Sequence, residues 1–239
     1  MNFLNKLEKK YRKYAIPNLM YYIVMLYGAG LVIQLFAPMA YWRFLSLDIG
    51  ALMHGQIWRL VTFIIYPPTM GTFVFDSVFF GIISLFLYYS LGVTLERVWG
   101  AFRFNVFFLM GMVGEILAAL VSYFVFHQNL YVTTGFLNFS LFLAFAICFP
   151  DVQFYLFMVI PVKAKWMAIA ESAVYVYSFL VGSASTRCEI VLSLANVILF
   201  FLMTRNYRRY APKEIKRRQE FKQQAKIVVP GKIVNLVVK

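Results

Sequence analysis

The chain has 239 residues, of which 62% are hydrophobic and 14% are charged, and its mean hydropathy is +0.72. A soluble domain is about 45–50% apolar and about 25% charged, so these values exclude an ordinary soluble protein. Excess apolar content in long runs predicts an all-α membrane protein with several spans. The net charge of +13 gathers mostly in the two terminal segments, and it does not by itself indicate a nucleic-acid partner.

Residues 1–16 form a basic segment that precedes the first apolar run. Its apolar residues recur at helical spacing, which favours a short amphipathic helix on the membrane surface, although a disordered anchor fits equally well. The apolar residues are Phe3, Leu4, Leu7 and Tyr11, and the basic ones are Lys6, Lys9, Lys10, Arg12 and Lys13.

Residues 17–204 are expected to form a six-span domain. The first span is expected at 17–36, before Pro38. The long connection at 39–72 is amphipathic, and the spacing of Leu45, Ile49, Leu52 and Met53 indicates an interfacial helix lying flat. The second and third spans are expected at 73–95 and 104–126.

The stretch after these spans is the centre of the predicted bundle. From Gly135 to Phe149 the chain is apolar except for Asn138 and Ser140. About fifteen residues are few for a hydrocarbon core of roughly 30 Å, so this fourth span is expected inside the bundle, where its polar groups meet protein.

The remaining core holds one segment that is too short to cross and two that are long enough. The seven apolar residues at 154–160 are expected to form an interfacial hairpin. The fifth and sixth spans are expected at 165–181 and 190–203. A strongly basic tail, 205–239, follows.

The distribution of basic residues predicts the orientation. Twenty of the 23 Lys and Arg residues fall in the two termini or in the loops at 96–103 and 163–165. The other three are Arg43, Arg59 and Arg187. The positive-inside rule then places both termini in the cytoplasm and favours an even number of spans. The basic termini are also suited to anionic lipid.

Several motifs resemble those of the rhomboid superfamily. Gln56, Trp58 and Arg59 resemble its Trp-Arg motif in the first loop, and Glu96, Arg97 and Gly100 resemble its acidic–basic–glycine turn after the second span. Residues 149–151 and 160–166 are similar to the link between spans four and five in bacterial rhomboids. The first two motifs also resemble the derlins, which are inactive members of the superfamily. The resemblance covers about residues 18–204 and implies a rhomboid-like bundle in a bacterial cell membrane.

The catalytic residues of that family have no counterpart here. An active rhomboid needs the serine of a Gly-x-Ser-Gly motif in the fourth span and a histidine in the sixth, because a serine hydroxyl is a weak nucleophile without a base. One alignment places the family serine at Leu137 and another at Gly135, and Asn196 stands where the histidine is expected. Neither alignment supplies a nucleophile, and an amide accepts no proton near neutral pH.

The resemblance therefore implies a pseudoprotease that binds transmembrane segments of client proteins in quality control, trafficking or assembly. Two alternatives stay open. One is an intramembrane serine protease with a relocated dyad, in which Ser140 would work with His54 or His127. The other is a transporter that uses the intramembrane acids Glu115 and Glu171.

The remaining polar residues are given structural interpretations, and no cofactor is expected. Asn138 is expected to form a helix–helix hydrogen bond, and Asp76 is expected to cap the second span. No His-rich, Cys-rich or paired-carboxylate pattern indicates a metal, and no Gly-rich loop indicates a nucleotide.

Overall fold

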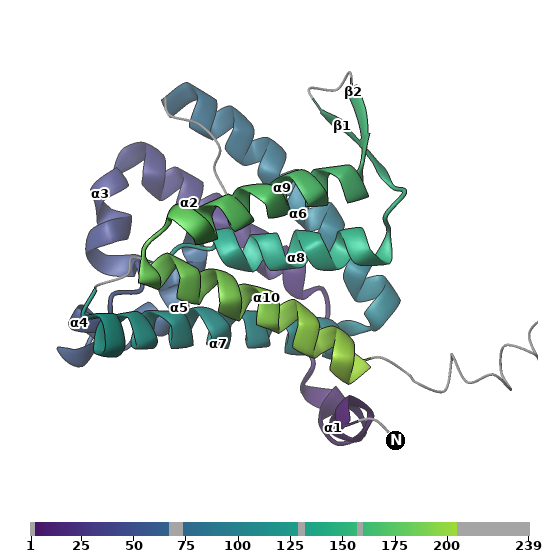
Figure 1. The fold of residues 1–239 in the computed structure, drawn as a ribbon, viewed down its shortest axis with the longest axis horizontal. Coiled ribbons are helices and arrows are strands. Elements are labelled where there is room, and N and C mark those ends of the chain that lie inside the picture. Colours follow the sequence, from purple (N-terminus) through teal and green to yellow (C-terminus); the bar gives the residue numbers. More distant parts are fainter. Residues whose placement is uncertain (1–2, 67–73, 129–131, 157–159, 205–239) are drawn as a thin grey trace, which may run out of the picture.

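The computed structural model describes residues 3–66, 74–128, 132–156 and 160–204, and these are helical almost throughout (Figure 1). Four helices are apolar and long enough to cross a membrane, as expected of an α-helical membrane protein. They are α2 (Leu19–Phe36), the Phe79–Trp99 part of α6 (Val74–Trp99), α7 (Ala101–Phe126) and the Ala184–Met203 part of α10 (Ala184–Thr204). Three expected features lie outside the described part: the basic tail at 205–239, residue 73 at the start of the second span, and the side chain of Asp76.

Two of the six expected spans are not among these four. α9 (Ala164–Val181) carries Lys165 and Glu171 and is less apolar than the four. α8 (Gly135–Cys148) is apolar but has 14 residues, which corresponds to about 21 Å at 1.5 Å per residue. Length and composition therefore support four spans, and any further crossing depends on α8 and α9.

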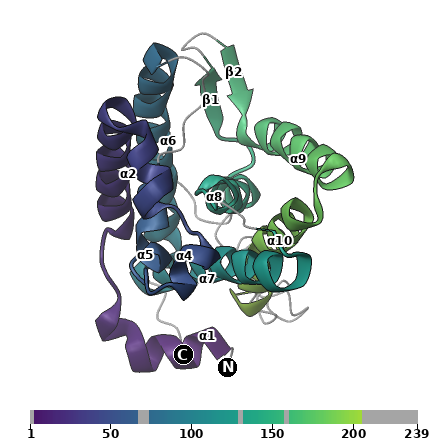
Figure 2. The same ribbon diagram turned by 90° about the vertical axis from the view of Figure 1, so that its left-hand side faces the viewer.

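The short helix α8 lies in the middle of the bundle, as its length and polar residues predict. In Figure 2, α2 and α6 lie on one side of it and α9 lies on the other. Nine of its 14 residues are buried, including Asn138 and Ser140. Protein surrounds most of α8, so its polar groups can be satisfied by neighbouring helices.

The basic N-terminal segment contains a helix, α1 (Phe3–Tyr11), which is one of the two expected forms. Leu4 is buried in the bundle, and Glu8 accepts a hydrogen bond from Nε of Arg103 on α7 at 3.0 Å. These contacts hold α1 across one end of the bundle (Figure 2), with Lys9 and Lys10 exposed.

The connection after α2 is not the one flat helix that was expected. Asp48 Oδ1 accepts a hydrogen bond from the Ala51 N–H at 3.3 Å and starts a new helix, and Gly55 at φ +93° turns the chain again. The connection consists of α3 (Pro38–Ala40), the π-helical turn η2 (Tyr41–Leu45), α4 (Ile49–Met53), α5 (Arg59–Thr62) and the 3₁₀ turn η3 (Phe63–Ile65).

The polar turn expected after the second span is mostly helix. α6 continues through Glu96 and Arg97, and Gly100 turns the chain at φ +86°. Glu96 does not pair with Arg97, because its Oε1 accepts from the backbone N–H of Asn18 at 2.7 Å while Arg97 is exposed. Glu96 therefore joins the end of α6 to the start of α2 instead of stabilising the turn.

The sixth expected span begins earlier than predicted, at Ala184 instead of residue 190. The hydroxyl of Ser183 accepts a hydrogen bond from the backbone N–H of Thr186 at 3.3 Å, as an N-terminal cap does. The polar residues at 185–189, which precede the expected span, belong to the first turns of the helix and not to a loop. Glu189 consequently lies within α10.

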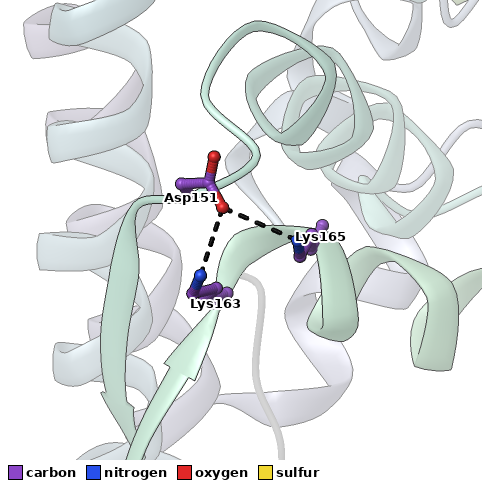
Figure 3. A network of polar contacts seen from close by, with 3 residues as sticks. All are labelled: Asp151, Lys163 and Lys165. Atoms are coloured by element: carbon purple, nitrogen blue, oxygen red, sulfur yellow. Dashed lines mark hydrogen bonds and ion pairs between the residues drawn. The ribbon is translucent and has the colours of Figure 1, made fainter.

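The hairpin expected at 154–160 has β structure. β1 (Gln153–Leu156) pairs with β2 (Ile160–Lys163) as antiparallel strands, and residues 157–159 lie outside the described part. At the base of this hairpin, Asp151 Oδ1 accepts from Nζ of Lys163 at 3.3 Å and lies 3.6 Å from Nζ of Lys165 (Figure 3). The hydrogen bond from Lys163 and the charges of both lysines lower the pKa of Asp151. This exposed contact adds little stability.

Candidate functional site

Arg59 is buried in the first loop, with 3% of its surface exposed, and binds oxygen atoms of that loop. Its Nη1 donates to the carbonyl of Ser46 at 2.7 Å, and its Nη2 donates to the carbonyl of Arg43. Its Nε donates to Oε1 of Gln56 at 2.7 Å. A guanidinium in this amphipathic loop is expected to hold either loop carbonyls or lipid headgroups. The structure shows loop carbonyls, and these acceptors satisfy a buried charge.

In an amphipathic first loop Trp58 is expected to pack against the bundle, but the structure contradicts this prediction. The side chain is 50% exposed, and its Nε1 donates to the carbonyl of Phe44 at 3.1 Å. Neighbouring helical residues point about 100° apart at 3.6 residues per turn, so burying Arg59 turns Trp58 outward. Trp58 and Arg59 therefore both hold the turn η2, from its outer and inner sides.

The first loop is tied to the start of α8. Thr134 donates its hydroxyl to the carbonyl of Tyr66 at 2.8 Å, and Leu47 and Val132 form an isolated antiparallel bridge. Within the loop, Tyr41 donates to the carbonyl of Phe63 at 3.1 Å, and burial raises the pKa of the Tyr41 hydroxyl. The loop and the central helix thus form one connected structure.

Asn138 forms the helix–helix hydrogen bond that was expected of it. Its Oδ1 accepts from the hydroxyl of Tyr27 on α2 at 3.0 Å, and its Nδ2 donates to Oγ1 of Thr134 at 3.1 Å. Tyr27 is fully buried, and its role was not predicted from the sequence. A tyrosine in the middle of an apolar span was the available signal, because a buried phenol needs a partner.

Ser140 is buried, and its hydroxyl is engaged within its own helix. The hydroxyl donates to the carbonyl of Leu137 at 2.8 Å. His54 and His127 are exposed, and Nδ1 of His54 lies 2.8 Å from the carbonyl of Gly50. Among the described residues, no hydrogen bond joins Ser140 to either histidine, so the relocated dyad is not assembled in this structure.

Leu137 on α8 and Asn196 on α10 meet beside Gly111 of α7. A Cβ atom at Gly111 would lie 2.4 Å from Cδ1 of Leu137 and 3.0 Å from Nδ2 of Asn196. Both side chains are buried, and neither amide atom of Asn196 has a hydrogen-bond partner within the described residues. Gly135, the other aligned position of the family serine, lies at the exposed start of α8.

The two acids expected inside the membrane, Glu115 and Glu171, lie on different helices, and a third acid, Glu189, lies within α10. Glu115 on α7 is 4% exposed, and its Oε2 has no hydrogen-bond partner among the described residues. Glu171 on α9 is partly exposed. Glu189 on α10 is 8% exposed. Glu189 was not predicted to lie within a span, because the expected start of the sixth span, residue 190, comes after it.

In the described part of the chain, no group of three or more His, Cys, Asp or Glu side chains is placed to hold a metal ion. The chain was compared with family models, with curated proteins and with solved structures, and none of them matches it.

Proposed function

We propose that this chain is a catalytically inactive, rhomboid-like protein that binds transmembrane segments of other membrane proteins. In this proposal α2, α6, α7, α8, α9 and α10 are the six spans, and both termini lie in the cytoplasm. Binding of these clients takes part in their quality control, trafficking or assembly.

The meeting of Leu137 and Asn196 beside Gly111 carries this proposal. Leu137 is one of the two positions to which the rhomboid resemblance assigns the nucleophile, Gly135 being the other, and Asn196 stands where the base is expected; they come from helices that are distant in the sequence. Leucine has no nucleophile and an amide is no base, so an active site of this family cannot operate here. The contacts of Gln56 and Arg59 in the first loop add support, because both belong to the Trp-Arg motif.

The buried polar groups of the bundle support the binding of client helices. The amide of Asn196 and Oε2 of Glu115 lack partners among the described residues. Hydrocarbon offers no hydrogen bonds, so a client helix with polar residues gains by leaving lipid for a bundle that has donors and acceptors to share.

Capture of such helices is the direct test of this function. The full chain would be placed in lipid nanodiscs with photo-crosslinkable transmembrane peptides of one leucine–alanine sequence that have asparagine or leucine at the centre. We expect the asparagine peptide to be crosslinked more than the leucine peptide. Equal, background-level crosslinking of both peptides would contradict client binding.

Absence of proteolysis is a separate expected result. The purified protein should not react with a serine-directed fluorophosphonate probe or cleave transmembrane substrates, since the hydroxyl of Ser140 is bonded to its own helix. An active rhomboid serves as the positive control. Labelling or cleavage that disappears in Ser140→Ala would establish the relocated dyad.

The buried Glu115 also favours a second candidate, the transport of protons or other cations with Glu171. Flux into proteoliposomes that falls in Glu115→Gln would identify a transporter. A client-binding protein is expected to give no flux above that of empty liposomes.

The orientation is tested by cysteine labelling in intact cells, on a background without Cys148 and Cys188. The charge distribution predicts that a cysteine in the 205–239 tail is protected from an impermeant thiol reagent. A cysteine at Ile57, which is 69% exposed in the first loop, should be labelled and serves as the control. External labelling of the tail would refute the orientation.

A further inference from the structure

The exposed side of α1 carries a cluster of basic residues that continues at the end of α6. α1 leads into the 3₁₀ turn η1 (Arg12–Tyr14), and α6 ends at Trp99, two residues after Arg97. Five basic side chains here are exposed, and none of them forms an ion pair with a carboxylate of the described residues. They form what we call the basic face: Lys9, Lys10, Arg12, Lys13 and Arg97.

A hydrogen bond brings the end of α6 close to η1. The backbone N–H of Asn18 donates to Oε1 of Glu96 at 2.7 Å, and Asn18 follows Tyr14 by four residues. Four residues span at most about 14 Å of chain, so the end of α6 and η1 lie at the same end of the bundle. The basic residues of α1, η1 and α6 are therefore neighbours in space.

The two acids of this region both face other partners. Glu8 pairs with Nε of Arg103 at 3.0 Å. Oε1 of Glu96 is bonded to Asn18, and Oε2 of Glu96 is buried. Neither carboxylate is placed to neutralise the basic face, so its positive charge is directed outward.

The apolar side of α1 is covered by protein. Leu4 is 1% exposed, and α1 contacts α7 and α10 at the end of the bundle that Figure 2 shows. An amphipathic helix at a membrane usually inserts its apolar side among the acyl chains. Because Leu4 is buried against the bundle, α1 presents its charged side to the surroundings.

Two exposed tyrosines accompany these lysines. Tyr11 is 40% exposed, and Nζ of Lys10 lies 5.3 Å from the centre of its ring. Tyr14 is 69% exposed, and Nζ of Lys13 lies 4.9 Å from the centre of its ring. Tyrosine is enriched where a membrane meets water, because its ring is apolar and its hydroxyl is polar. The tyrosines therefore favour a lipid headgroup over a free anion as the ligand of this surface.

We infer that the basic face binds the phosphate groups of anionic phospholipids and holds this end of the bundle at the membrane surface. The site is built jointly by α1, η1 and the end of α6, and it does not depend on the binding of client helices. In the proposed orientation it lies at the cytoplasmic surface, where anionic lipids give a negative potential. Each basic residue near such a surface strengthens the attraction about fivefold.

The test titrates the full chain in detergent with phosphatidylglycerol or with phosphatidylcholine of the same acyl chains, and native mass spectrometry counts the bound lipids. We expect phosphatidylglycerol to bind more tightly. Lys9→Gln/Lys10→Gln should weaken its binding about tenfold or more, because two charges leave the basic face. Binding of phosphatidylcholine and the temperature of unfolding should not change, since both side chains are exposed.

Lys163→Gln/Lys165→Gln is the matched control, because it removes the same net charge outside the basic face. These two lysines already face Asp151, at 3.3 Å and 3.6 Å. We expect this variant to bind phosphatidylglycerol nearly as tightly as the wild type does.

Equal affinity of the wild type for the two lipids would overturn the inference. Unchanged binding of phosphatidylglycerol by Lys9→Gln/Lys10→Gln would also overturn it, because the anionic lipid would then be held elsewhere on the chain. Displacement of phosphatidylglycerol by inorganic phosphate at equal concentration would identify a site for free anions and would exclude a lipid site.

Discussion

Replacing Arg59 with lysine is expected to destabilise the protein nearly as much as replacing it with alanine. The guanidinium donates from three nitrogens to Ser46, Arg43 and Gln56, which lie in different directions around it. An ammonium group is a compact donor on a flexible stem and cannot reproduce this planar fork. Each charged hydrogen bond contributes about 1.5–3 kcal/mol, so the loss is large compared with the marginal stability of most proteins.

Thermal unfolding in detergent measures this effect. Arg43 provides the matched control, because its backbone carbonyl accepts from Arg59 while its own side chain is exposed and contacts the ring of Phe44. Arg43→Lys and Arg43→Ala should therefore be mild. If Arg59→Lys unfolds at the wild-type temperature, the site needs only a positive charge. The structural role assigned here to the planar guanidinium would then be contradicted.

Gly111→Ala is expected to destabilise the bundle by about 1–3 kcal/mol, the usual cost of overpacking a core. The new methyl group would collide with Cδ1 of Leu137 and press on Nδ2 of Asn196. Both neighbours are at least 96% buried, so neither can swing away into open space.

Gly114→Ala is the matched control, one turn along the same helix. Its Cβ would meet only the Leu192 carbonyl at 3.7 Å, an ordinary contact, and alanine favours a helix over glycine by up to about 1 kcal/mol. We expect this variant to be neutral or stabilising.

A double-mutant cycle of Gly111→Ala with Leu137→Ala tests whether these two residues touch. The two single costs should sum to more than the cost of the double variant, because the smaller side chain makes room for the methyl group. Strict additivity would contradict the arrangement that carries the proposed function.

The apolar helices and the central position of α8 could be predicted because both follow from length and hydrophobicity. α2 and α7 begin within three residues of the expected starts and end at the expected residues. The role of Arg59 was also predictable, since a guanidinium in a half-polar loop must find acceptors. The orientation of Trp58 was not, because it depends on which side of the single turn α5 faces the bundle.

The start of α10 shows a second limit of sequence reasoning. The residues from Ser185 to Glu189 are mostly polar, and polarity at the end of a span is commonly a loop. Here Ser122 donates to Ser185 Oγ at 2.6 Å, and Ser185 donates to Oε1 of Gln128 at 2.7 Å. These tertiary partners satisfy the polar turn inside the bundle, and a single sequence does not reveal them. Because this turn was not predicted to be helical, Glu189 was not predicted to lie within a span.

The enclosure of α8 has a consequence for how the chain is made. Translation runs from the N-terminus, so Tyr27 and Tyr66, which contact Asn138 and Thr134, are already present when α8 emerges. α10, whose Ser193 donates to the carbonyl of Phe136 at 2.9 Å, is synthesised after them. Until α10 emerges, one side of the short helix α8 has no protein neighbour. The nascent chain is therefore expected to hold α8 by its earlier neighbours until α10 has been synthesised and can cover the remaining side.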